Sequence, residues 1–196
     1  IEVNGLDRKT RTVCDRALKE WQNAKLPPNA IPSFTEWSKA RSALAEAKIP
    51  ALLELVAQHE EAGEPLVVFS AHRAPIDALA GREGWATITG DTTPEERTRI
   101  EEQFQAGQLR GVAGTIQAAG VAITLTHAAR AVFVDLAPTP ALNGQAEDRI
   151  YRIGQNRGVL ITQLVADHAL DRHINELLQR KRDLIEASID SAAVVA

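Results

Sequence analysis

Two arginines and a glutamine recur at helical spacing within residues 145–155, Gln-Ala-Glu-Asp-Arg-Ile-Tyr-Arg-Ile-Gly-Gln. If this segment is a helix, Gln145, Arg149 and Arg152 lie at i, i+4 and i+7 and share one stripe. A neighbouring apolar stripe at the same spacing consists of Ala146, Ile150 and Ile153. One face of such a helix could dock on a core while the next holds two guanidiniums and an amide towards a group outside. The alternative is a surface helix whose arginines pair with Asp148 and other nearby acids.

The composition is that of an ordinary soluble domain. Of the 196 residues, 44% are hydrophobic and 24% are charged, and the formal net charge is -4. An acidic chain does not bind nucleic acid through a global positive field, so any such binding must be local. No apolar run approaches the roughly 18 residues of a membrane-spanning helix, and no basic and apolar leader opens the sequence. We therefore expect a soluble intracellular protein in the cytoplasm, associated with the nucleoid if the source is bacterial.

The apolar pattern predicts helices first and then strands that alternate with helices. Amphipathic spacing predicts helices within residues 1–24, 35–48 and 51–61. After Gly63, short apolar runs predict strands at 66–70, 86–89, 111–115, 131–135 and 159–165. Thr93-Pro94-Glu95-Glu96 matches a capping box at the start of a helix, and a long final helix should begin at Asp167 or Asp171.

Strands separated by helices indicate an α/β fold with a parallel sheet. We expect a three-layer αβα arrangement with five to six parallel strands, preceded by a helical N-terminal segment. Ligands of such sheets bind beyond the carboxyl ends of the strands. The residues expected along this edge are Thr115, Asp135 and the loops after Phe69 and Thr89.

Several sequence signatures of catalysis are missing. There is no Gly-x-x-x-x-Gly-Lys-Ser/Thr loop to cradle a triphosphate and no Gly-x-Gly-x-x-Gly fingerprint after a strand. The five histidines are scattered without metal-ligand spacing, the single Cys14 has no partner cysteine, and Ser70 lacks a nucleophile-elbow context. Hydrolysis by serine, cysteine or a resident metal is therefore unsupported.

Residues from Pro65 to about Ile185 resemble the second RecA-like lobe of superfamily 2 helicases. They look most like the Swi/Snf-type double-stranded DNA translocases, in the branch with annealing helicases and stand-alone bacterial members. Residues 145–155 match motif VI, Gln-Ala-x-x-Arg-x-x-Arg-Ile-Gly-Gln, at every fixed position. Four other segments are similar to the family more weakly. Val67–Ser70 is similar to motif IV and Thr115–Thr126 to motif V. Gly90, Thr92, Arg97 and Phe104 are similar to the segment that follows motif IV, and Lys48-Ile49 to the start of the lobe. Two departures are Ala122, in place of a usual glycine in motif V, and Pro138, in place of a usual tryptophan.

The resemblance implies that ATP with Mg²⁺ binds between two lobes and that this chain supplies the arginines that meet the γ-phosphate. Arginine suits this role because it is always charged and presents a planar fork of donors. Arg152 is the first choice for the arginine finger and Arg149 the second. The residues expected at the nucleotide are Gln145, Gly120 and Asp148. The residues expected at nucleic acid are Ser70, His72, Arg73, Thr92, Thr115 and Thr126.

The same resemblance predicts the domain organisation and the partners. Residues 1–62 should be a helical segment or linker from the preceding lobe, 63–187 the C-terminal RecA-like lobe and 188–196 a tail. The partners should be the N-terminal RecA-like lobe of the same polypeptide, which carries the phosphate loop, and double-stranded DNA. The isolated chain should therefore be essentially inactive as an ATP hydrolase.

Two other functions stay open on the sequence alone. The lobe could be a non-catalytic module that docks on a protein or on DNA, a reading that the net acidity and the two motif departures permit. An unrelated flavodoxin-like ligand binder would share the same alternation of strands and helices. A phosphate loop and an Asp-Glu pair encoded upstream of this chain would favour the motor over both.

Overall fold

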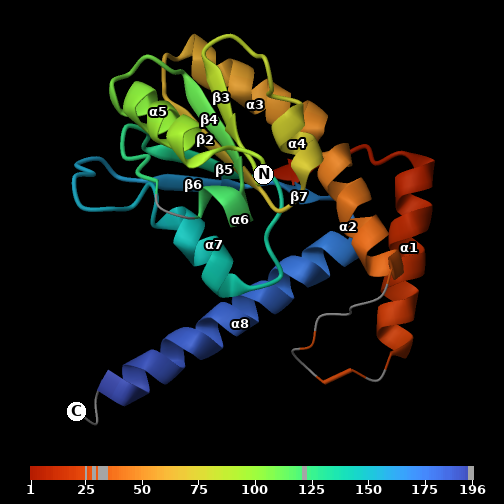
Figure 1. The fold of residues 1–196 in the computed structure, drawn as a ribbon. Coiled ribbons are helices and arrows are strands. Elements are labelled where there is room, and N and C mark those ends of the chain that lie inside the picture. Colours follow the sequence, from red (N-terminus) through yellow and green to blue (C-terminus); the bar gives the residue numbers. More distant parts are fainter. Residues whose placement is uncertain (25, 28–29, 31–34, 121–122, 194–196) are drawn as a thin grey trace.

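A five-stranded parallel sheet forms the centre of the molecule (Figure 1). The computed structural model describes residues 1–24, 26–27, 30, 35–120 and 123–193. The strands lie in the order β3-β4-β2-β5-β6 and comprise β2 (Leu66–Ser70), β3 (Trp85–Ile88), β4 (Gly111–Thr115), β5 (Arg130–Phe133) and β6 (Leu160–Gln163). All the pairings are parallel, which confirms the predicted α/β class.

Helices cover both faces of the sheet because its central strand is apolar on both sides. Val67 and Phe69 of β2 face one core, and Leu66 and Val68 face the other. The first face is covered by α5 (Pro94–Gln105), α6 (Ile116–Ala119) and α7 (Pro140–Glu147). The second face is covered by α3 (Ile49–Glu61) and α4 (Arg73–Asp77). The three layers are those predicted from the alternation of strands and helices.

A third apolar cluster lies beside the sheet, between helices from the two ends of the chain (Figure 1). It is formed by α1 (Arg8–Asn23), α2 (Thr35–Ala47) and the long α8 (Ala169–Ala193). A small parallel sheet joins β1 (Glu2–Val3) to β7 (Val165–Ala166). Helices α1 and α2 therefore pack against each other and against the C-terminal helix, whereas α3 packs on the main sheet.

The strand predicted at 159–165 divides between the two sheets. The Leu164 amide donates to Phe133 in the main sheet, 2.9 Å, and the Val165 amide donates to the Ile1 carbonyl, 2.9 Å. The last helix begins at Ala169, between the two predicted starts, and continues past residue 188. The division of the chain at 62 and 187 stays a prediction.

The capping box at the start of α5 is confirmed. Thr93 Oγ1 accepts from the Glu96 amide and the Glu96 carboxylate accepts from the Thr93 amide, both at 3.2 Å. Pro94 occupies the first turn, where a missing amide costs no helical hydrogen bond. From this helix Arg97 donates to the Ala118 carbonyl in α6, and the Phe104 ring packs edge-on against His127.

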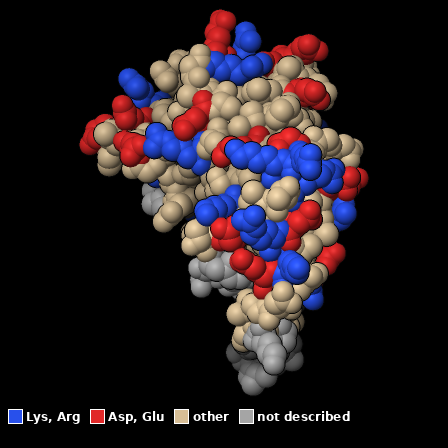
Figure 2. All heavy atoms as spheres, turned by 90° about the vertical axis from the view of Figure 1, so that its right-hand side faces the viewer, with Lys and Arg blue, Asp and Glu red and all other residues tan. Residues whose placement is uncertain are grey.

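The exposed face of α1, α2 and the start of α8 carries mixed charge. Figure 2 shows Lys and Arg side chains interspersed with Asp and Glu on this side of the molecule, with no broad area of one sign. This agrees with the small net charge of -4. Among the described residues, no helix combines the length and the apolar character needed to cross a membrane.

Candidate functional site

The helix that leads into residues 145–155 is shorter than predicted. It ends at Glu147, so Arg149 and Arg152 lie in the turns that follow it and not on a helical stripe. The Leu125 amide donates to the Arg149 carbonyl, 2.8 Å, and thereby occupies the acceptor that a continuing helix would need. The prediction of one helix over 145–153 was therefore wrong, because α7 ends at Glu147 and a distant segment pairs with the turn that follows it.

The apolar stripe is only partly as predicted. Ala146 and Ile150 are buried in the core on this face of the sheet. Ile153 is fully exposed, and Tyr151 is 73% exposed. The turn thus anchors itself through Ile150 and then carries Tyr151, Arg152 and Ile153 out to the surface.

Both arginines line one open hollow of about 600 Å³. Arg152 Nη1 donates to Thr124 Oγ1, 3.1 Å, and Arg149 Nε donates back to the Gln145 carbonyl, 3.0 Å. No ion pair between described residues involves either guanidinium. The hollow is lined by Asp148, Arg149, Tyr151, Arg152, Ile153 and Gln155. The alternative of a surface segment whose arginines pair with local acids is therefore disfavoured, since two positive charges stay uncompensated.

The loop that carries the arginines is fixed to the segment between α6 and β5. Gln155 Nε2 donates to the carbonyls of Thr126, 3.1 Å, and Ala128, 2.7 Å. Arg157 donates to the His127 carbonyl. The segments that resemble motifs V and VI are thus in direct contact, although Val121 and Ala122 lie outside the described residues.

The residues predicted to contact the nucleotide lie on both sides of this contact. A Cβ atom at Gly120 would lie 2.8 Å from the Ile116 carbonyl oxygen and 3.9 Å from Gln145 Cβ, so these two positions are neighbours with no room for a larger side chain. Gln145 and Asp148 are exposed, and Asp148 shares the hollow with the arginines.

A second polar cluster lies at the carboxyl ends of β2 and β5. Asp135, which is buried, accepts hydrogen bonds from Ser70 Oγ, from the Ala71 amide, 3.1 Å, and from His72 Nδ1, 2.5 Å. Ser70 is fully buried and also accepts from the His72 amide, 3.0 Å. Ser70 therefore positions His72 in this structure, and His72 is the partly exposed member of the pair.

The electrostatics of Asp135 follow from these contacts. Burial raises its pKa, but the hydrogen bond and the charge of His72, together with the Ser70 hydroxyl, lower it by more. The pKa of Asp135 is therefore below its ordinary value. An ionised carboxylate accepts only, so His72 Nδ1 is the donor and Nε2 is left for another contact.

The sequence analysis did not predict two buried or half-buried cations beside this cluster, Arg41 and Lys48, or the carboxylates that they pair with. Arg41 of α2 donates to the Leu136 carbonyl and lies 3.7 Å from Asp135 Oδ2. Lys48 is 1% exposed, and its Nζ lies 2.7 Å from Asp171 Oδ2 and donates to the Val134 carbonyl, 3.1 Å.

A signal for the burial of Lys48 was present. Lys48 stands at i+4 from Leu44 and i-4 from Leu52, both of which are buried, so it interrupts an apolar stripe.

The other residues predicted to contact nucleic acid spread over two regions. Arg73 is exposed and pairs with Asp77, 3.2 Å, and Asp91, 2.5 Å. Thr92 Oγ1 accepts from the Thr89 amide, 2.9 Å.

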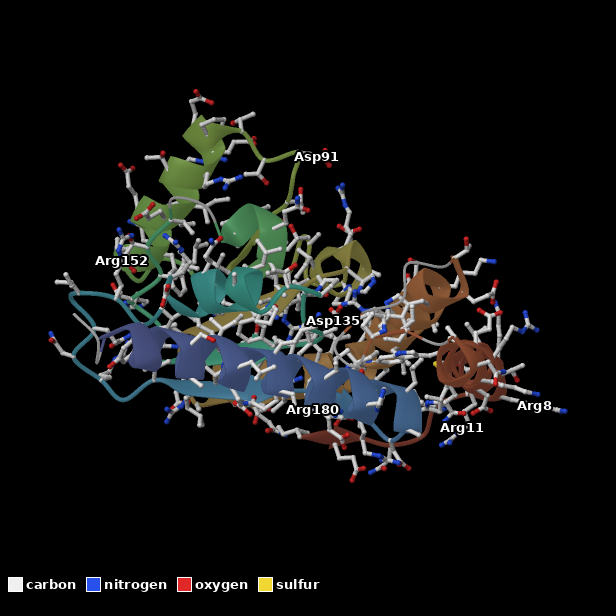
Figure 3. The ribbon with its side chains drawn as sticks, turned by 90° about the horizontal axis from the view of Figure 1, so that it is seen from below. Arg8, Arg11, Asp91, Asp135, Arg152 and Arg180 are labelled. Carbon is white, nitrogen blue, oxygen red and sulfur yellow. The ribbon has the colours of Figure 1, made fainter. Side chains whose placement is uncertain are left out.

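Thr115, at the end of β4, lines a separate hollow of about 450 Å³ with Gly90, Arg97, Gln117 and Ala118. Thr126 accepts from Gln105, 2.8 Å, and lies beside the arginine loop. Figure 3 shows Asp91, the partner of Arg73, well apart from Asp135, the partner of His72, and from Arg152, so the predicted residues do not form one pocket.

Comparisons with known proteins agree with the motifs and the fold. The model of the helicase conserved C-terminal domain matches residues 47–154, more than half of the chain. The chain is 35% identical over 188 residues to the SWI/SNF-related matrix-associated actin-dependent regulator of chromatin subfamily A-like protein 1 of Xenopus tropicalis, covering 92% of this chain and 20% of that protein. The chain thus spans about a fifth of the length of the curated relatives that it matches.

Two solved structures share the fold. The SWI2/SNF2 ATPase core of Sulfolobus solfataricus in complex with dsDNA has a TM-score of 0.69 at 20% identity and covers 97% of this chain and 46% of that one. The C-terminal domain of the Sulfolobus solfataricus SWI2/SNF2 ATPase has a TM-score of 0.64 at 16% identity and covers 95% of this chain and 88% of that one. The chain belongs to the helicase conserved C-terminal domain family, and it is a C-terminal lobe of the Swi/Snf type.

Proposed function

We propose that this chain is the C-terminal lobe of an ATP-dependent DNA translocase or helicase and that it supplies Arg152, assisted by Arg149, to ATP bound with Mg²⁺ on the N-terminal lobe of the same polypeptide. The observation that carries this proposal is the pair of uncompensated guanidiniums on a fixed loop in an open hollow. The chain contains no phosphate loop of its own, so an anion for these arginines must come from elsewhere.

The residues around the hollow fit a nucleotide phosphate. Arg152 would place its charge on the transferring phosphoryl oxygens, where a fixed guanidinium stabilises charge as it develops. Arg149 and Gln145 would orient the same group, and the tight approach at Gly120 would bring the motif V backbone near it. Asp148 repels phosphate, so its contact would be to a sugar hydroxyl or to the Mg²⁺ shell.

The DNA contacts are proposed along the carboxyl edge of the sheet. His72 presents Nε2, Arg73 begins α4 directly after it, and Thr92 lies in the loop after β3 and Thr115 at the end of β4 along the same edge. Ser70 would act through His72, because its own hydroxyl is buried against Asp135. Thr126 would join the arginine loop to this track. Contacts of this kind bind the phosphate backbone and position the duplex without reading its sequence.

The test is ATP turnover by the full-length polypeptide with Arg152→Ala. Loss of an arginine finger lowers turnover by roughly 10³-fold to 10⁵-fold, and DNA affinity should stay the same because Arg152 is not among the residues proposed to contact DNA. Arg99→Ala, an exposed arginine of α5 outside both hollows, is the matched control and should leave turnover unchanged. Unchanged turnover in Arg152→Ala would remove the finger assignment.

The same measurement separates the motor from a docking module. The isolated chain should hydrolyse essentially no ATP, with or without DNA, since it holds half of the composite site. If the full-length polypeptide lacks an upstream phosphate loop and turns over no ATP, the lobe is a non-catalytic protein- or DNA-docking module.

A further inference from the structure

We propose that Arg182 of α8 is a positioning residue for the arginine finger and that it acts through Glu147, the last residue of α7. The inference rests on the proposed function of Arg152. Arg182 Nη2 donates to Glu147 Oε1 at 2.6 Å, with the two side chains 35% and 25% exposed. The pair joins the long C-terminal helix to the element that leads directly into the arginine turn (Figure 1).

Glu147 is the residue from which the arginine turn starts. Its backbone carbonyl accepts from the amides of both Ile150 and Tyr151, each at 3.0 Å. Arg149 is therefore enclosed within a turn closed on Glu147, and Arg152 follows one residue after it. A displacement of Glu147 is carried to both guanidiniums through the backbone.

The charge of Glu147 is unfavourable where it stands. A carboxylate at the C-terminal end of a helix meets the negative end of the helix dipole, and the acidic Asp148 follows it. Arg182 supplies the cation that this position calls for. An ion pair this exposed adds little to global stability, so a role in holding the local geometry explains it better than a role in folding.

This ion pair also bridges a hollow beside the end of α7. A cavity of about 270 Å³ separates α7, α8 and β6, and both Glu147 and Arg182 line it. Close side-chain packing does not fill this region, so the charged contact fixes the end of α7 relative to α8 where the cavity leaves room for movement.

The experiment measures ATP turnover, KM for ATP and DNA affinity in the full-length polypeptide with Arg182→Gln. A small misplacement of a catalytic group can lower rate by up to about 100-fold, so we expect kcat to fall by about tenfold or more with KM and DNA affinity unchanged. Arg180→Gln is the matched control. Arg180, labelled on α8 in Figure 3, is exposed and donates to the Glu176 carbonyl of its own helix, 3.3 Å, and its variant should keep full turnover.

Charge exchange distinguishes positioning from a loss of structure. Arg182→Glu alone should lower kcat further, and the double variant Glu147→Arg with Arg182→Glu should recover most of it. Thermal unfolding of each variant checks that the fold is retained. Equal turnover in Arg182→Gln and Arg180→Gln, or a loss that the exchange does not recover, would overturn the proposal. Arg152→Ala in the same series separates the two ideas: if it abolishes turnover while Arg182→Gln leaves turnover unchanged, the positioning role alone fails, and if Arg152→Ala has no effect, the proposed function fails.

Discussion

At the scale of single residues, the ion pair between Lys48 and Asp171 links the helices around the third apolar cluster to the main sheet. The Lys48 ammonium also donates to the Val134 carbonyl, just past the end of β5, and Asp171 Oδ2 accepts from the Ala166 amide, 2.7 Å. Each group is therefore paired and hydrogen-bonded, which is the condition under which a buried charge is tolerated. Removal of one partner leaves the other charge buried without compensation.

Lys48→Met should lower the free energy of unfolding by about 3 to 5 kcal/mol, because it strands the Asp171 carboxylate in the core. Urea denaturation measures this change. Lys39→Met is the control on α2, since the exposed pair of Lys39 with Glu36 contributes little to stability. A second variant that adds Asp171→Leu should recover part of the loss, and a Lys48→Met protein as stable as the Lys39→Met protein would contradict this account.

At the scale of elements, the local signals were predicted well and the long-range ones were not. The strand at 66–70 and the capping box at Thr93 depend on neighbouring residues, and both were found from the sequence. The end of α7 and the division of 159–165 depend on partners far along the chain, the Leu125 amide and the Ile1 carbonyl. No local pattern contains that information.

The candidate site shows the same division. Arg149 and Arg152 were predicted as site residues because they belong to a motif with fixed spacing, and this assignment stays a prediction. The contacts of Asp135 with Ser70, His72 and Arg41 were not predicted, because they require three distant segments to meet at one edge of the sheet. Sequence predicted the edge itself, through the carboxyl ends of the strands, but not which side chains would be buried there.

Gly111 makes a testable contact between elements at the start of β4. A Cβ atom there would lie 2.5 and 2.6 Å from Cζ2 and Cζ3 of the Trp85 ring. The ring cannot move freely, because Trp85 Nε1 donates to Glu60, 2.7 Å, and Glu60 is held in turn by Arg82.

Gly111→Ala should therefore destabilise the protein by about 1 to 3 kcal/mol, the usual cost of overpacking, despite the general preference for alanine over glycine in strands. Chemical denaturation monitored by tryptophan fluorescence gives the measurement. Gly158→Ala, where no atom lies within 4 Å of the added methyl group, is the control and should change stability little. Equal stability of the two variants would mean that β3 and β4 move apart to admit the methyl group.

At the scale of the whole molecule, the packing of the third apolar cluster indicates whether α1 and α2 are part of the lobe or an appendage. Trp21 of α1 packs edge-on against Trp37 of α2, with ring centroids 4.7 Å apart, and against His173 of α8, 4.3 Å apart. These residues are outside the matched segment 47–154, yet α8 buries its apolar stripe on them. The Lys48–Asp171 pair then connects this cluster to β5, so we expect a single cooperative unit.

Trp21→Ala should accordingly lower the free energy of unfolding of the whole chain by about 3 to 5 kcal/mol, as expected for a large aromatic removed from a core. The variant should still unfold in a single transition. Cys14 provides a second readout because it is the single cysteine of the chain and is fully buried beside this cluster. Burial, with the charges of Asp171 and Asp15, raises the pKa of its thiol to about 12, so the native protein should react slowly with iodoacetamide at pH 8. In Trp21→Ala the labelling rate should rise in step with the loss of global stability, because opening of the third core and unfolding of the sheet are one event. Fast labelling with an unchanged main transition would instead show that α1 and α2 open independently of the lobe.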